Sequence, residues 1–169
     1  MCIRDSIPFI KKTDDFHAKV NSNFNKNVSF IENGDSIKTL QELLVKFKGK
    51  PILVDFWFST CGPCVSNFQR FGKDLEKFTV QNDITLLCVS IDKEQEQWHT
   101  AIKYYKIGGK HIKACQSLHE DIYKTHNVHI FPHYMLVGSD GKILINRLKD
   151  LSEHDNFYNQ IYDALAKEE

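Results

Sequence analysis

Hydrophobic residues along the middle of the chain follow two different periods. Nearly continuous apolar runs at 52–58 and 84–91 are typical of strands buried on both faces of a sheet. Between these runs, apolar residues recur at steps of three and four, which predicts a helix over 63–79. A second helix is expected over 94–105, beginning in a charged, solvated stretch at 92–97. Strands that alternate with helices predict parallel pairing and an α/β fold.

The segments on either side of this unit extend the sheet. A short strand is expected at 28–31, followed by a helix that Asp35 or Ser36 caps and Gly49 ends. The helix expectation rests on the spacing of Ile37, Leu40, Leu44 and Phe47. We therefore expect an N-terminal strand and helix extension ahead of the central unit.

The last third of the chain has the pattern of an antiparallel hairpin. Apolar runs at 134–137 and 142–145 flank the turn sequence Gly-Ser-Asp-Gly. A short strand at 111–115 and a helix at 118–126 are expected before the hairpin, and a final helix after it, starting near Ser152. The hairpin makes the predicted central sheet mixed, with helices flanking it.

Composition limits the kind of protein. The chain has 169 residues, of which 41% are hydrophobic, which suits one domain with its own core. Lys plus Arg and Asp plus Glu both number 22, so no basic surface for nucleic acid is expected. No apolar run is long enough for a transmembrane segment.

The beginning of the chain is treated separately. Residues 1–6, Met-Cys-Ile-Arg-Asp-Ser, resemble the translation of a transposon-based sequencing adapter, although an ordinary N-terminus is the alternative. We interpret 1–6 as an adapter-derived artefact, 7–29 as a linker or the remnant of a lost upstream segment, and 30–169 as the folded domain. A signal peptide, tether or further domain upstream would then be missing from this sequence.

Cys61-Gly62-Pro63-Cys64 lies where a buried strand gives way to a helix. A cysteine at a helix N-terminus is stabilised as a thiolate by unpaired amides and the helix dipole, so Cys61 is the expected nucleophile and Cys64 the resolving thiol. The same spacing also occurs in zinc sites and structural disulfides. No second cysteine pair accompanies this one, so no metal is expected.

The residues around this motif resemble the thioredoxin superfamily. The resemblance rests on Val54-Asp55-Phe56-Trp57, the Cys61 to Cys64 motif and Phe131-Pro132, and it covers the chain from Phe30 onward. The segments ahead of the first buried strand and around the hairpin are most similar to TlpA- and ResA-like bacterial envelope oxidoreductases. The resemblance implies a thioredoxin fold and a redox-active disulfide between Cys61 and Cys64.

The family implies further roles for named residues. Asp55 matches the buried acid that moves the proton of the resolving cysteine, with a hydrogen-bonded strand acid as the alternative. Pro132 matches the proline that is cis in this fold, and with Phe131 it would hold the substrate. Trp57 matches the aromatic residue beneath the site, or is plain core. Thr60 takes the place of a common tryptophan beside the substrate.

Departures from the family pattern concern the helix after the motif. Gln69 replaces a helix proline, and Asn67 replaces the acid of ResA-like proteins, which puts a role in cytochrome c maturation in doubt. Cys88 is expected to be a buried core thiol. Cys115 is interpreted as a bystander, although its setting permits a redox role.

These features predict a monomeric thiol-disulfide oxidoreductase that reduces protein disulfides, receives electrons from an upstream thiol donor and needs no cofactor. Family resemblance places it in the periplasm or cell envelope, with the cytoplasm as the alternative. A non-catalytic binding module with a structural disulfide is the competing hypothesis. Peroxidase chemistry is a third possibility, although its usual hallmark is a lone cysteine at this turn.

Overall fold

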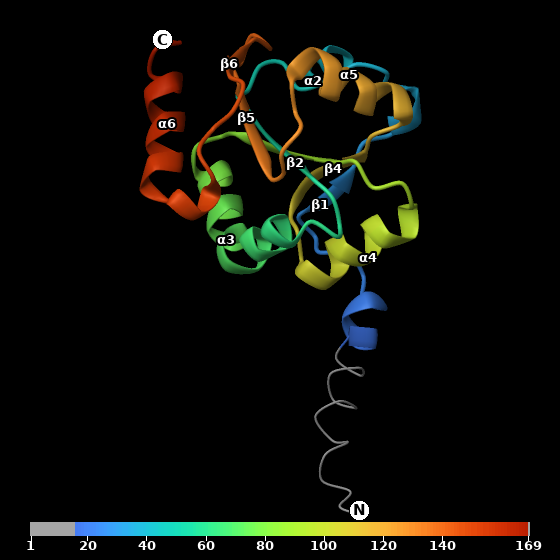
Figure 1. The fold of residues 1–169 in the computed structure, drawn as a ribbon. Helices are drawn as coiled ribbons and strands as arrows, with labels where there is room; N and C mark the ends of the chain where they lie inside the picture. Colours follow the sequence, from blue (N-terminus) through green and yellow to red (C-terminus); the bar gives the residue numbers. More distant parts are fainter. Residues whose placement is uncertain (1–15, 169) are drawn as a thin grey trace, which may run out of the picture.

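A mixed sheet forms the centre of the computed structural model, which describes residues 16–168 (Figure 1). Its order is β1-β4-β3-β2-β5-β6. Strands β1 to β4 run parallel to one another, β5 pairs antiparallel with β2, and β6 pairs antiparallel with β5. The strands are β1 (Val28–Phe30), β2 (Ile52–Trp57), β3 (Thr85–Ser90), β4 (Gly109–Lys113), β5 (His133–Val137) and β6 (Ile143–Ile145). The expected α/β fold, with its mixed sheet and N-terminal extension, is confirmed.

Helices cover both faces of this sheet (Figure 1). The helical elements are η2 (Gly34–Ser36), α2 (Leu40–Val45), α3 (Gly62–Gln81), α4 (Gln95–Tyr105), α5 (Gln116–His126), η3 (Leu151–Glu153) and α6 (Asp155–Leu165). One core cluster joins α2 and α5 to the sheet, and two others join α3, α4 and α6 to the opposite face. The sheet is therefore buried on both sides, as the apolar runs predict.

Strand β2 divides its side chains between these two layers. Ile52, Val54 and Phe56 belong to the cluster under α2 and α5, whereas Leu53 and Trp57 pack under α3, α4 and α6. Asp55 lies between Leu53 and Trp57 in the alternating pattern, so its carboxyl faces the layer beneath α3. The strand thus places an acid inside an apolar interior.

Several element boundaries differ from the sequence prediction. Asp35 and Ser36 form η2, and Ile37 then takes an extended conformation, so the expected caps of α2 are wrong. The cap is Thr39, whose hydroxyl accepts from the Glu42 amide while the Glu42 carboxylate accepts from the Thr39 amide.

The final helix also starts later than expected. Ser152 lies in η3, where Asp150 caps the turn by accepting from the Ser152 amide, and α6 begins at Asp155. β4 begins at Gly109, whose φ of +104° is readily adopted by glycine, and it pairs there with Val28 of β1.

The described part of the expected linker contacts the domain. Residues 16–20 are helical, and the Phe16 ring lies 5.4 Å from that of Tyr104. Phe24 packs against Phe30 and His99, with ring-centroid distances of 4.8 and 5.3 Å. The boundary at residue 30 stays a prediction, while residues 1–6 lie outside the described residues. No helix within 16–168 has the length and apolar character needed to cross a membrane.

Candidate active site

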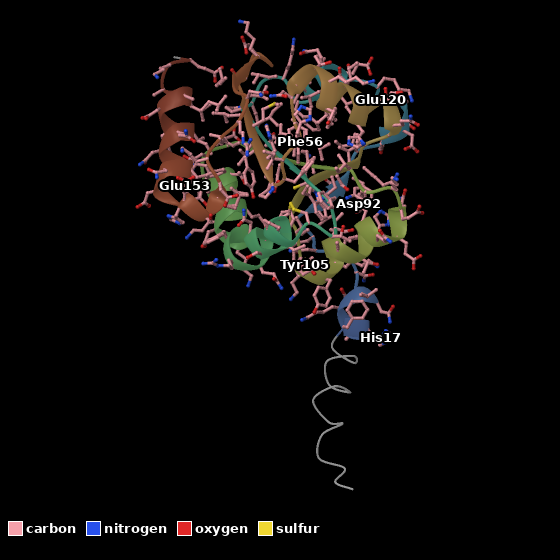
Figure 2. All side chains as sticks on the ribbon, viewed as in Figure 1. His17, Phe56, Asp92, Tyr105, Glu120 and Glu153 are labelled. Atoms are coloured by element: carbon pink, nitrogen blue, oxygen red, sulfur yellow. A yellow bond between two sulfur atoms is a disulfide. The ribbon has the colours of Figure 1, made fainter. Side chains whose placement is uncertain are left out.

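The cysteine pair lies at the start of α3, where Cys61 is the N-cap and Pro63 is in the first turn. The two sulfurs form a disulfide, drawn in yellow in Figure 2, with a Cα to Cα distance of 5.3 Å. The Cys64 amide donates to Cys61 Sγ at 3.2 Å. Cys61 and Cys64 are 4% and 1% exposed, whereas Gly62 and Pro63 are exposed. A helix N-terminus that already donates to this sulfur would stabilise a thiolate after reduction.

A buried carboxylate, which sequence reasoning missed, fixes the loop before Cys61. Asp92 is 8% exposed and accepts from the Ser59 amide at 3.0 and 3.1 Å, from the Ser59 hydroxyl at 2.6 Å and from the Ser90 hydroxyl at 2.7 Å. The expectation of a solvated start at 92–97 is therefore wrong for Asp92, which Figure 2 labels. A sequence signal did exist, because Ser59 and Asp92 follow parallel neighbouring strands whose ends meet at one sheet edge.

Aromatic side chains pack in the core cluster that contains the disulfide. Trp57 is fully buried in the core cluster that contains both cysteines, and its ring meets that of Phe68 at 5.1 Å in an edge-to-face arrangement. Trp57 therefore packs in the same core cluster as the cysteine pair. Its packing is also that of a core residue, so its part in substrate binding stays a prediction.

The loop before β5 forms the other side of the site. The peptide between Phe131 and Pro132 is cis, and Pro132 is partly exposed. His133 pairs with Phe56, which places Pro132 level with the end of β2. Phe131 packs against the cluster holding the two cysteines, and its ring lies 5.5 Å from that of Phe58.

Two exposed residues lie near these strand ends. Thr60, immediately before Cys61, is exposed, and Ile130, ahead of the cis bond, is 58% exposed. An apolar residue beside a cis-proline loop was not singled out from the sequence. Partly or fully exposed loop residues thus surround a disulfide that is itself mostly covered.

Asp55 is the buried acid of this region. It is 1% exposed, and within residues 16–168 neither carboxylate oxygen has a hydrogen-bond partner. Burial, and secondarily the negative charge of Asp150, raise the pKa of Asp55 well above its ordinary value. The alternative of a hydrogen-bonded strand acid is therefore wrong for the described residues.

A cavity of about 350 Å³ reaches Asp55 from the surface between α3 and the end of α4. Asp55, Cys88 and Phe68 line it together with Lys73 and Lys106. The acid is thus enclosed by protein and still borders a space that small molecules such as water can enter.

Cys88 and Cys115 are the free cysteines among the described residues. Cys88 is fully buried, and its thiol donates to the Gly108 carbonyl at 3.6 Å. Cys115 is the N-cap of α5, and its thiol donates to the Ile37 carbonyl at 3.2 Å. Across 16–168, no group of three or more His, Cys, Asp or Glu side chains is placed to hold a metal ion.

Asn67 and Gln69, the two residues of α3 that depart from the family pattern, differ in their surroundings. Gln69 is exposed, so nothing in the core depends on it. Asn67 is 5% exposed, and its amide nitrogen lies 3.2 Å from the Tyr134 hydroxyl and 3.4 Å from both carboxylate oxygens of Asp150. Where ResA-like proteins have an acid, this chain has an amide that contacts an acid from another element.

Comparison with known proteins places this geometry in a family. The thioredoxin-like family model matches residues 49–143, more than half of the chain. The thioredoxin domain of a thiol-disulfide oxidoreductase from Bacteroides vulgatus is 31% identical, with a TM-score of 0.60, covering 71% of this chain and 82% of that one. A thiol:disulfide interchange protein from a Bacteroides species is 30% identical, with a TM-score of 0.59, covering 70% of this chain and 74% of that one.

Curated sequences match over a shorter region. A chloroplastic thioredoxin-like protein from Nicotiana benthamiana is 33% identical over 61 residues, or 36% of this chain. The matched region spans 32% of that relative's length. Together these findings confirm the expected similarity to the thioredoxin superfamily and its bacterial TlpA- and ResA-like branch. The chain belongs to the thioredoxin-like family.

Proposed function

We propose that this protein reduces disulfides in partner proteins by using Cys61 and Cys64 as a dithiol. The observation that carries the proposal is the position of Cys61 as the N-cap of α3, with its sulfur accepting from the Cys64 amide at 3.2 Å. This environment favours the thiolate, which is the form that attacks disulfides. Cys64 is within disulfide-bonding distance, so the pair can close after the attack.

The first step forms a mixed disulfide. The Cys61 thiolate attacks one sulfur of the substrate disulfide, the substrate S–S bond breaks, and the second substrate sulfur leaves as a thiolate that takes a proton from water. Phe131, Pro132 and Thr60 would border the substrate segment at this stage, because they lie along the partly exposed edge at the ends of β2 and β5.

The second step returns the enzyme to its oxidised form. Cys64 gives its proton to the Asp55 carboxylate and attacks Cys61 Sγ, so that the Cys61–Cys64 disulfide forms and the mixed disulfide breaks. The first substrate sulfur leaves as a thiolate that takes a proton from water, and Asp55 returns its proton to the solvent. The substrate gains two electrons and two protons over the cycle, and the dithiol loses the same number. Asp55 suits this role because it is buried and its raised pKa makes it a stronger base than a solvated carboxylate.

The wider setting follows from the same proposal. A thiol donor must reduce the Cys61–Cys64 disulfide again after each cycle, because the two electrons passed to the substrate have to be replaced. We propose that the protein acts as a monomer in the cell envelope, the location that the sequence resemblance to TlpA- and ResA-like proteins implies. Two solved bacterial relatives are named a thiol-disulfide oxidoreductase and a thiol:disulfide interchange protein, which supports the chemistry. The Gly-Pro insert of the motif supports reduction as the physiological direction.

Insulin reduction tests the activity. Wild type with dithiothreitol should accelerate precipitation of the insulin B chain, whereas Cys61→Ser should lose this acceleration. Cys115→Ser is the matched control, because it removes a partly buried thiol that lies outside the motif. Equal rates for wild type and Cys61→Ser would favour a binding module with a structural disulfide instead.

A redox titration against glutathione tests the direction. A potential near that of thioredoxin, about −270 mV, is expected for a reductant. A potential near about −120 mV, typical of DsbA, would reverse the assignment to an oxidant of protein thiols.

A further inference from the structure

Four buried titratable residues lie side by side across the sheet. The strand registers pair His111 with Cys88, Cys88 with Asp55, and Asp55 with Tyr134, so the row crosses β4, β3, β2 and β5. Directly paired residues on neighbouring strands point to the same face, which here is the face beneath α3 and α4. Each of the four is at most 2% exposed.

Burial disfavours the charged form of each residue in this row. Burial lowers the pKa of His111 to about 4, so its ring is uncharged at neutral pH. Burial, and then the negative charge of Asp55, raise the pKa values of both the Cys88 thiol and the Tyr134 hydroxyl. A negative charge on Asp55 therefore has no cation beside it within the row.

At the Tyr134 end of the row, the Asn67 side chain connects Tyr134 with a second carboxyl group, that of Asp150. The Asn67 amide donates toward the Tyr134 hydroxyl at 3.2 Å and toward both Asp150 oxygens at 3.4 Å. Asp150 is half-buried, and one of its oxygens also accepts from the Ser152 amide at 2.9 Å and from the Ser152 hydroxyl at 2.5 Å.

Asp55 and Asp150 thus differ in what surrounds them. Asp150 has donors from Asn67 and Ser152, whereas Asp55 has none among the described residues. Asp150 is therefore the hydrogen-bonded carboxyl group of the pair, and Asp55 is the one enclosed by the interior. After burial, the negative charge of Asp150 raises the pKa of Asp55 and so opposes the loss of its proton.

We propose that Asp150, held next to Tyr134 by Asn67, is a positioning residue that strengthens Asp55 as the base of the resolving step. This inference rests on the proposed disulfide reduction and assigns a part in it to residues outside the cysteine motif. The Asn67 amide contacts the Asp150 carboxyl group, which comes from the segment before η3.

Other charged groups face Asp55 and Cys88 from the surrounding elements. α3 contributes Lys73 to the wall of the cavity and Glu76 near Cys88, and Lys106 follows α4. Lys19, from the N-terminal helix, also lines the cavity. Besides burial, Asp150 is the group whose charge raises the pKa of Asp55. The lysines line the cavity, whereas Asp150 does not, so a substitution of Asp150 leaves the charges around the cavity unchanged.

The test replaces Asp150 by Asn and follows the proton of Asp55 directly. Asn retains an oxygen that can accept from Ser152, so the η3 cap should survive. The protonated carboxyl band of Asp55, identified by its loss in Asp55→Asn, is titrated by infrared spectroscopy of the oxidised protein. Asp155→Asn is the matched control, because it removes the same charge from a side chain that is 92% exposed.

Asp150→Asn should lower the midpoint of the Asp55 titration by about one pH unit, whereas Asp155→Asn should leave it unchanged. The pH profile of insulin reduction should move in the same direction. A midpoint in Asp150→Asn equal to that of Asp155→Asn would overturn the proposal. Because the infrared titration requires no turnover, this result can be separated from a failure of the proposed activity.

A second variant should shift the midpoint of the Asp55 titration in the opposite direction. It keeps the proposal testable if Asp150→Asn does not fold. Asn67→Asp adds a carboxyl group between Tyr134 and Asp150 and should raise the midpoint of the Asp55 titration. A fall in this midpoint, or no change, would contradict the proposal even if Asp150→Asn could not be purified.

Discussion

Replacing Asp55 by Asn should stabilise the protein at neutral pH. The carboxyl is 1% exposed and its two oxygens have no hydrogen-bond partner in the described part of the chain, so ionisation leaves an uncompensated charge in the interior. Burial and the charge of Asp150 raise its pKa in the folded state. Asn has similar shape and cannot ionise, so the substitution removes this penalty and keeps the packing.

The sign follows from proton binding. Between the ordinary aspartate pKa, about 3.9, and the raised folded pKa, the unfolded chain has lost the Asp55 proton while the folded protein keeps it. Folding stability from this group therefore falls as pH rises, by about 1.4 kcal/mol per pH unit, until the folded pKa is reached. Asp55→Asn should lose this slope, and its advantage over wild type should grow across the same interval.

Urea unfolding of the oxidised proteins at a series of pH values measures the effect. Using the oxidised form excludes the titration of Cys61 and Cys64. Asp163→Asn, which removes an exposed acid, is the control and should follow wild type at every pH. If the difference in unfolding free energy between wild type and Asp55→Asn is independent of pH, Asp55 does not have a raised pKa and the reasoning fails.

Three further substitutions test the scaffold by urea unfolding at pH 7. Asp92→Ala removes the acceptor of the Ser59 amide and hydroxyl and should cost about 3 kcal/mol; a loss below about 0.5 kcal/mol would mean that this carboxylate does not fix the loop before Cys61. Thr39→Ala breaks the capping box with Glu42 and should cost about 1 kcal/mol, whereas an unchanged midpoint would refute the cap. Gly109→Ala should cost about 2 kcal/mol, because φ is +104° and the added Cβ would lie 3.0 Å from a backbone oxygen; wild-type stability would show that this strand can shift.

Local patterns sufficed for the core of the fold and for the cysteine motif. The apolar run of β2 is buried at every position, and the switch to helical spacing places Cys61 at the start of α3. Such features depend on neighbours in the sequence, so they can be read without knowledge of distant contacts. The cis bond before Pro132 was predicted from family resemblance and not from the local sequence, because a proline before a strand is compatible with either isomer.

Features that depend on tertiary contacts were missed. Asp92 follows β3 and looked like the polar start of a helix, yet it is buried because Ser59 arrives from the neighbouring strand. The link from Asn67 to Tyr134 and Asp150 joins α3, β5 and the segment before η3. The spacing of residues within one segment does not predict a contact between segments this far apart in the sequence. Such a contact can be identified only once the register of the sheet is known.

The central claim is that Cys61 is the attacking thiol of a dithiol cycle. Reduced Cys64→Ser is mixed with a disulfide-containing peptide, alkylated in acid and analysed by mass spectrometry after proteolysis. The peptide should be trapped on Cys61 in this variant, whereas Cys61→Ser should trap little or none. Equal trapping in Cys61→Ser, or an adduct found on Cys115 in place of Cys61, would contradict this claim.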